Sequence, residues 1–136
     1  MRIMAIDYGD ARTGVAVSDE SATLVGDAWV INCRKADELA DIIAREATSR
    51  SVGCVVVGYP KNMDGSIGER AEKCEAFVHK LRDICDIDTK LWDERLTTMS
   101  ANKVLTEAGK FGKKRKNTID AVAASLILEG YLGSLR

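Results

Sequence analysis

The sequence predicts an α/β fold, with a mixed five-stranded sheet that carries helices on both faces. Three strand-like segments, over residues 2–7, 14–19 and 24–31, follow one another without a helix between them. Helical and strand patterns then alternate, and the apolar run VGCVVVG over 52–58 has the composition of a strand covered on both faces. These observations predict an antiparallel meander of three strands joined to two parallel strands.

The meander begins at the N-terminus. The segment RIMAID over 2–7 is short, apolar and β-branched, and it stops before Gly9. A brief polar turn leads to GVAVSD over 14–19, so these two segments are expected to form a hairpin. The segment LVGDAWVI over 24–31 then adds the third strand.

A helix and the most apolar strand follow the meander. One face of the helix predicted over 36–48 is apolar and consists of Leu39, Ile42, Ile43 and Ala47. The strand over 52–58 ends before Pro60, the only proline. Because a strand buried on both faces is typical of parallel pairing, it is expected to run parallel to the first strand.

The second predicted helix and the last strand come next. Residues 61–65 have the composition of a loop, and Ser66 and Glu69 have the spacing of a capping box. This spacing predicts a helix from Ser66 to Cys85. The strand predicted over 87–93 ends at the charged Asp93–Glu94–Arg95.

Two further helices are predicted at the C-terminal end, separated by a basic loop. The first covers 98–108 and stops at Gly109, and the loop KFGKKRKN covers 110–117. The last helix is expected to begin near Thr118 and to bury Ile119, Val122, Ala123, Leu126 and Ile127. Without a repeat or linker, residues 1–136 are expected to form one domain.

Composition limits the class of protein. With 46% hydrophobic and 30% charged residues, the chain is expected to fold, and its net charge of −1 gives no general argument for nucleic-acid binding. The four cysteines form no close pair, and His79 alone cannot complete a zinc site with them. No segment reaches the length of a membrane span, and the expected location is the cytosol.

Three carboxylates occupy positions where a site is expected. Asp7 ends the first buried strand, Glu94 follows the last strand, and Asp120 sits in the first turn of the last helix, at the edge of its apolar stripe. If the first and last strands are neighbours, Asp7 and Glu94 meet at the carboxyl ends of the strands, where sites form in open sheets. Such a cluster requires a cation, and oxygen ligands favour Mg²⁺ or Mn²⁺ over zinc.

Each of the three residues taken alone is also compatible with a structural role. Asp7 before Gly9 fits a turn, Glu94 fits a solvated position or a pair with Arg95, and Asp120 fits a favourable position in the helix dipole. Their joint placement favours the metal site.

Four motifs give the chain a resemblance to a known family. The segments are IDYGDARTGVAVSD over 6–19, VVVGYPKNMDGSIGERAE over 55–72, LWDERLTTMSA over 91–101 and IDAVAASLIL over 119–128. In this order and spacing they resemble the YqgF/RuvX family of proposed Holliday junction resolvases. The chain differs mildly at Tyr59, where an aliphatic residue is common, and in its dense basic run.

The resemblance implies an RNase H-like fold and nuclease activity. In bacteria this activity is attributed to processing of the precursor of the small-subunit (16S) ribosomal RNA, and earlier to junction resolution. The family's acidic residues match Asp7, Glu94 and Asp120. Two Mg²⁺ or Mn²⁺ ions held by them, with Asp7 between the ions, can activate water and stabilise the leaving oxygen of a phosphodiester.

Basic and polar residues near these positions are candidates for nucleic-acid binding. The candidates are Arg12, Asn62, Arg70, Arg95, Lys113, Lys114 and Lys116. For the lysines of the basic run, a solvated loop is an equally good interpretation.

Other functions remain open from the sequence. An ATP-handling protein of the actin-like class shares a strand, Asp and Gly at its phosphate loop, but usually closes two such domains on its nucleotide. A non-catalytic RNA-binding domain and a junction resolvase are also compatible with the motifs. The expected partner is nucleic acid, either precursor rRNA or branched DNA, and no association with a membrane is expected. The expected oligomeric state is a monomer or a weak homodimer.

Overall fold

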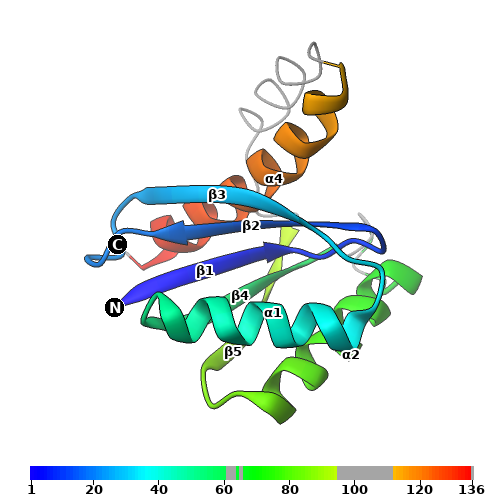
Figure 1. Cartoon of the computed structure of the whole chain (residues 1–136), viewed down its shortest axis with the longest axis horizontal. Coiled ribbons are helices and arrows are strands. Elements are labelled where there is room, and N and C mark those ends of the chain that lie inside the picture. The colour runs from blue at the N-terminus through cyan, green and yellow to red at the C-terminus, as the bar shows by residue number, and fades with distance from the viewer. Residues whose placement is uncertain (61–63, 65, 95–111, 136) are drawn as a thin grey trace.

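A five-stranded sheet forms the centre of the computed structural model. The structure describes residues 1–60, 64, 66–94 and 112–135, and it leaves out the side chains of residues 112–118. The strand order is β3-β2-β1-β4-β5 (Figure 1). The strands are β1 (Arg2–Asp7), β2 (Arg12–Ser18), β3 (Val25–Asn32), β4 (Val52–Tyr59) and β5 (Asp88–Asp93).

The pairing confirms the predicted mixed sheet. β2 is antiparallel to β1 and to β3, whereas β4 is parallel to β1 and to β5. The condition considered for Asp7 and Glu94, that the first and last strands are neighbours, does not hold, because β4 lies between them. This order follows from composition, since the most apolar strand takes a place with a partner on each side and a helix layer on each face.

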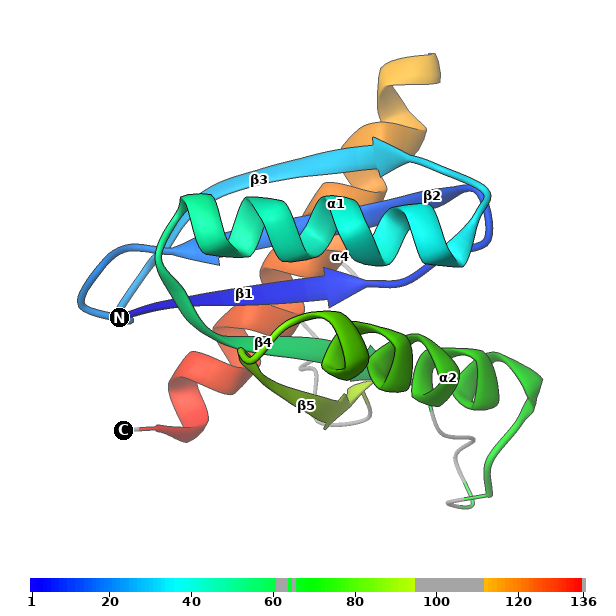
Figure 2. The ribbon, with the colours of Figure 1, turned by 60° about the horizontal axis from the view of Figure 1, so that its bottom comes forward.

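Helices cover both faces of the sheet. In Figure 2, α1 (Ala36–Ser49) and α2 (Glu69–Ile84) lie in front, and α4 (Gly112–Ser134) crosses obliquely behind. The core on the side of α1 and α2 contains Met4, Ile6, Val15, Val55, Val57, Leu39, Ile43, Phe77 and Leu81. The core on the side of α4 contains Ile3, Ala5, Ala16, Cys54, Val56, Ala124, Ile127, Leu128, Tyr131 and Leu132.

The start of α2 differs from its prediction. The helix begins at Glu69 with Gly68 as its N-cap, and no side chain caps it. Ser66 instead donates from its backbone N and its hydroxyl to Asp64 Oδ1, at 2.9 and 2.6 Å. The capping box is therefore wrong, because a local turn with Asp64 competes for the serine hydroxyl.

The start of α4 also differs. The helix begins at Gly112 and not near Thr118, so most of the predicted basic loop over 110–117 is helical. Lysine and arginine are good helix formers, and the glycine stands at the first helical residue, where it does not interrupt the helix. In Figure 1 the first turns of α4 extend past β3, beyond the edge of the sheet.

The buried stripe of α4 is shifted from the predicted one. It follows Ala124, Ile127, Leu128, Tyr131 and Leu132, and of the five predicted positions only Ile127 is fully buried. The helix predicted over 98–108 lies outside the described residues. In the described part of the chain, the four cysteines are free and no helix could span a membrane.

Candidate metal-binding active site

The three candidate carboxylates come from three elements that meet at the carboxyl end of β1. Asp7 is the last residue of β1, Glu94 directly follows β5, and Asp120 lies in α4. Asp120 is not in the first turn of its helix, because α4 begins at Gly112. A purely structural role for Asp120 in the helix dipole therefore loses its basis, since that effect is confined to the first turn.

Gly14 allows α4 to approach the strand end that carries Asp7. In the pairing of β1 with β2, Gly14 lies opposite Asp7. A Cβ atom on Gly14 would be 1.9 Å from the backbone oxygen of Asp120, so no other residue fits without moving the helix. This contact brings Asp120 over the end of β1.

Gly58 has the corresponding role for Glu94. β4 separates β1 from β5, and the pair Ile6 and Val57 places Gly58 beside Asp7. A Cβ atom on Gly58 would be 3.1 Å from the carboxyl carbon of Glu94 and 2.6 Å from Ile127 Cδ1. The Glu94 side chain therefore crosses the end of β4 in space that a larger residue would fill.

The electrostatics show how close the carboxylates lie. Burial, together with the charges of Glu94 and Asp120, raises the pKa of Asp7 from 3.8 to about 7 against the opposing effect of Arg70, and burial is the largest of these causes. Burial also raises the pKa of Glu94, while Arg70 lowers it and Asp93 raises it. The ionised forms of Asp7 and Glu94 are thus disfavoured first by burial and then by neighbouring carboxylates, and Arg70 offsets part of this effect.

The nearby thiol of Cys74 offers no competing ligand. Burial, with smaller contributions from the charges of Glu94 and Asp7, raises the pKa of Cys74 to about 12 against the opposing effect of Arg70. A thiol with such a pKa stays protonated, and a protonated thiol is a poor metal ligand. Among the described side chains, the donors available beside Asp7 are therefore carboxylate oxygens.

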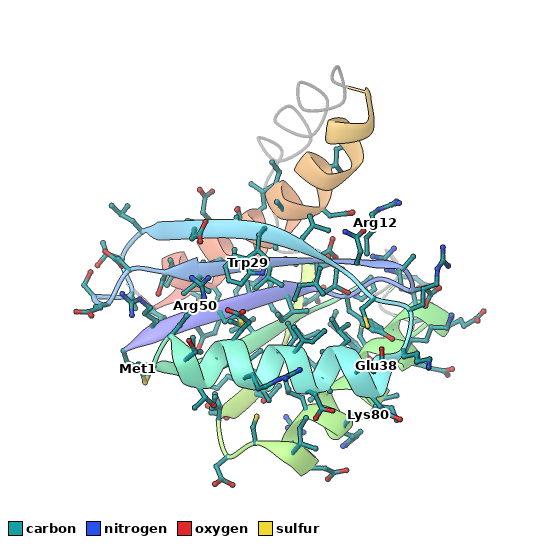
Figure 3. All side chains as sticks on the ribbon, in the orientation of Figure 1. Met1, Arg12, Trp29, Glu38, Arg50 and Lys80 are labelled. Carbon is teal, nitrogen blue, oxygen red and sulfur yellow. The ribbon has the colours of Figure 1, made fainter. Side chains whose placement is uncertain are left out.

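Two arginines from different elements contact the carboxylates. Arg12 Nε, in β2, donates to Asp120 Oδ2 at 3.0 Å. Arg70, in α2, places one guanidinium nitrogen 3.6 Å from Asp7 Oδ1 and donates to the backbone oxygen of Tyr8 at 3.4 Å. Figure 3 shows Arg12 at the end of the sheet opposite Met1.

A hollow adjoins each arginine. The Arg70 hollow, of about 350 Å³, is lined by Tyr8, Gly9, Asp10, Glu69, Arg70 and Lys73. The Arg12 hollow, of about 240 Å³, is lined by Ala11, Arg12, Asn32, Cys33 and Arg34. Each hollow thus holds a second basic side chain beside the arginine.

The donor set fits a hard divalent cation. Carboxylate oxygens suit Mg²⁺ and Mn²⁺, and a divalent cation would offset the burial and the mutual repulsion that raise the pKa of Asp7. Within the described ranges, no three acidic, His or Cys side chains are grouped tightly enough to hold a metal ion as they stand. Binding an ion would therefore require the carboxylates to move closer together.

The structure brings together only part of the predicted site. The carboxyl end of β1 is the place where five predicted residues meet: Asp7, Glu94, Asp120, Arg12 and Arg70. Asn62 and Arg95 lie outside the described residues, as do the side chains of Lys113, Lys114 and Lys116.

Asp93 belongs to the other face from Glu94, because side chains alternate along a strand. It pairs with Tyr59, whose side chain packs on the side of α2, while the preceding Trp92 packs on the side of α4.

Four residues with a place near the site were missed from the sequence. Gly14 and Gly58 stand inside strand patterns, and an isolated strand glycine is a signal of close backbone approach. Lys73 lies one helical turn after Arg70, but its position beside the site depends on how α2 is placed. Nothing in the local sequence indicates that Arg34 lies beside Arg12.

The comparison with protein families covers almost the whole chain. The profile of the RuvX family, described as Holliday junction resolvase, matches residues 1–134. A relative from Halothermothrix orenii is 48% identical over 132 residues, which cover 97% of this chain and 94% of the relative. A relative from Bacillus thuringiensis is 43% identical over 136 residues and covers 98% and 99%. Both are named as pre-16S rRNA nucleases, an activity that their names mark as provisional.

Solved structures share the fold at low sequence identity. RuvC from T. thermophilus, in complex with a Holliday junction substrate, has a TM-score of 0.66 and 12% identity, covering 98% of this chain and 96% of that one. The Fowlpox virus resolvase, in complex with its substrate Holliday junction DNA, has a TM-score of 0.60 and 14% identity, covering 99% of each chain. These similarities confirm the RNase H-like fold.

Proposed function

The chain belongs to the RuvX family of nucleases, and from this premise we propose that Asp7, Glu94 and Asp120 are the metal ligands of a nuclease that cleaves precursor 16S rRNA. One observation carries the proposal. Three carboxylates from β1, β5 and α4 converge at one sheet edge, and Asp7 there has a pKa raised to about 7. A cluster with uncompensated negative charge is suited to bind a divalent cation.

Each side chain has a separate task in this proposal. Asp7, the most deeply placed of the three, interacts with both Glu94 and Asp120 and would be the central ligand. Glu94 and Asp120 would be the ligands on either side of it. The bound cations would supply the activation of water and the stabilisation of the leaving oxygen, so no serine or cysteine nucleophile is required.

Positive side chains around the carboxylates supply the contacts to nucleic acid. Arg12 and Arg70 flank the carboxylates, and Lys113, Lys114 and Lys116 lie in the first turns of α4, the helix that carries Asp120. Contacts of this kind orient the phosphate backbone without reading its sequence. We assign the same role to Asn62 and Arg95 by their sequence positions.

The ion is Mg²⁺ or Mn²⁺ in this proposal, because all three ligands are hard oxygen donors. The names of the relatives at 48% and 43% identity support precursor 16S rRNA as the substrate.

A second candidate function is resolution of four-way DNA junctions, because the matching family profile is described as Holliday junction resolvase. Symmetric cleavage of a junction requires two active sites related by a twofold axis, hence a homodimer. Cleavage of a precursor rRNA requires only one site.

Replacing Asp7 with Asn tests the metal site. Asn keeps the size of the side chain but removes the shared charge, so Mn²⁺-dependent cleavage should fall by at least about 100-fold while the fold is kept. Without metal, the variant should be as stable as the wild type or more stable, because one of three repelling carboxylates is gone. Excess Mn²⁺ should raise the melting temperature of the wild type more than that of the variant.

Two outcomes would contradict the assignment. If Asp7→Asn unfolds the protein, Asp7 is a structural turn residue. If the variant stays folded and cleaves with metal at the wild-type rate, the metal site lies elsewhere. Parallel assays on a precursor 16S rRNA fragment and a four-way DNA junction, together with sedimentation of the protein, decide between the two candidate functions.

A further inference from the structure

The carboxylates of the site are paired with arginines that come from the solvent side. The Asp7 and Asp120 side chains are 14% and 23% exposed, whereas Arg70 and Arg12 are 65% and 41% exposed. Ion pairs with such exposed cations are weak, because water and salt screen them. A cation with a higher charge can therefore take over either carboxylate at a small cost in free energy.

Neither arginine is confined to its carboxylate. Arg12 is the first residue of β2 and faces Asn32 at the edge strand β3. Arg70 lies in the first turn of α2, and its nearest carboxylate oxygen is 3.6 Å away, longer than a hydrogen bond. Long side chains on such exposed ends can swing without disturbing the core.

The hollows provide a second position for each arginine. In the Arg12 hollow, Asn32 and Arg34 supply an amide and a second guanidinium, and none of the described residues that line it is acidic. In the Arg70 hollow, Lys73 supplies the second cation, although two acids that line the same hollow are paired with it, Asp10 at 3.3 Å and Glu69 at 3.8 Å. Paired cations with space between them are typical of a site for a phosphate group.

We propose that Arg12 and Arg70 are exchangeable counter-ions, which pair with Asp120 and Asp7 until a divalent cation displaces them onto backbone phosphates held in the adjacent hollows. The ligand class is the sugar-phosphate backbone of RNA or DNA. This inference rests on the proposed function, because it takes Asp7 and Asp120 as metal ligands. It adds Arg34 and Lys73 as residues that bind nucleic acid.

The exchange couples the two binding events. A metal ion frees the arginines, so it increases the affinity for nucleic acid, and nucleic acid increases the affinity for metal by the same factor. If each arginine only held its carboxylate in place, removing the arginine would instead weaken metal binding.

Calorimetric titration with Mn²⁺ alone, after removal of bound metal with EDTA, tests whether the arginines compete with the metal ion. Arg12→Gln and Arg70→Gln should each bind Mn²⁺ roughly three- to tenfold more tightly than the wild type, because one competing positive charge is gone. Arg12→Lys keeps the charge and should stay near the wild type. Arg45→Gln, an exposed arginine of α1, changes the net charge equally and should leave the affinity unchanged.

Anisotropy titration with a fluorescein-labelled precursor-rRNA fragment tests whether a bound metal ion increases the affinity for RNA. Ca²⁺ replaces Mn²⁺ in this experiment to slow cleavage. The wild type should bind more tightly with Ca²⁺ than without it, and this gain should shrink in Arg12→Gln. Arg34→Gln should leave the Mn²⁺ affinity unchanged but lower the slope of log affinity against log salt by about one, as expected for one lost phosphate contact. Of these two variants, only Arg12→Gln should change both metal and RNA binding.

The outcomes separate the two proposals. If the wild type binds no Mn²⁺, or binds it equally after Asp7→Asn, the proposed metal site is wrong and the exchange falls with it. If Mn²⁺ binding depends on Asp7 but is unchanged or weaker in both arginine variants, the exchange alone is overturned. An unchanged salt slope in Arg34→Gln overturns the phosphate site in the Arg12 hollow.

Discussion

The two faces of the sheet are packed differently, although the same strands supply both. On the side of α1 and α2, large side chains such as Met4, Ile6 and Phe77 fill the space between sheet and helices. On the side of α4, the sheet presents small residues such as Ala5 and Ala16, together with the two glycines of the site. The first face holds two helices at a distance, and the second allows one helix to approach closely.

This difference in packing gives the two faces different roles: one mainly stabilises the fold, and the other carries the candidate site. Because side chains alternate along a strand, neighbouring residues of β1 serve different faces. Ile6 packs in the large core, and Asp7 lies on the face of Ala5, where α4 brings Asp120. Changes on the first face should therefore act on folding, whereas changes on the second should act on the site.

The largest expected effect on stability is a cavity on the side of α1 and α2. Leu81, in α2, is fully buried. Leu81→Ala should cost about 2–5 kcal/mol of unfolding free energy, from lost burial and an unfilled cavity. Urea unfolding measures the cost, and cleavage per folded molecule should be unchanged. A loss of activity in the fraction that remains folded would show that the two faces are not independent.

The second effect is a pH dependence that comes from the face of α4. The Asp7 pKa of about 7 lies above its ordinary value of 3.8, so between these values the folded protein holds a proton that the unfolded chain has released. The resulting stability is complete below about pH 4 and is lost as the pH rises through 7, by about 2–4 kcal/mol without metal. Urea unfolding in EDTA across this range measures the loss.

Asp7→Asn is the control for this pH dependence. Asn does not titrate, so the stability of the variant should change much less between about pH 4 and 8. In excess Mn²⁺ the wild-type trend should reverse, because metal binds the deprotonated carboxylates. An identical pH dependence in the wild type and the variant would assign the titration to other groups.

A smaller expected effect on stability, with a large effect on cleavage, comes from Gly14→Ala. The new Cβ atom would meet the Asp120 backbone oxygen at 1.9 Å, so α4 has to shift, at about 1–3 kcal/mol. The shift moves Asp120 from Asp7, and cleavage should fall by at least about tenfold.

Gly58→Ala provides the matched comparison. Its nearest neighbour is the flexible end of Ile127, so it should destabilise less than Gly14→Ala, while it displaces the Glu94 carboxyl group by a few tenths of an ångström. Full cleavage activity in both variants would show that these close approaches do not set the geometry of the site.

Most of the fold could be predicted from the sequence because the patterns are local. Alternating and continuous apolar runs predict β1 to β5, and the helical face over 36–48 predicts α1. The predictions failed at the starts of α2 and α4. There, short-range interactions compete: Asp64 takes the Ser66 hydroxyl, and a basic segment that suits a solvated loop also suits an exposed helix.

The three carboxylates could also be proposed from the sequence, because each stands next to a predicted element end or apolar stripe. The expected route by which they meet is partly wrong, since β1 and β5 are not neighbours. Glu94 reaches Asp7 across β4, and only the glycine at position 58 leaves room for this.

The sequence by itself determined which residues could form a site: their chemistry, the strands and helices that carry them, and the face on which each side chain lies. The tertiary structure alone decided the order of the strands, the closeness of α4 to β2, and the pairing of Asp120 with Arg12 and of Asp7 with Arg70. The physical reason is the distance along the sequence over which each kind of interaction acts. Periodicity and propensity act over a few neighbouring residues, whereas these contacts join residues 63 to 108 positions apart, whose approach depends on how whole layers pack.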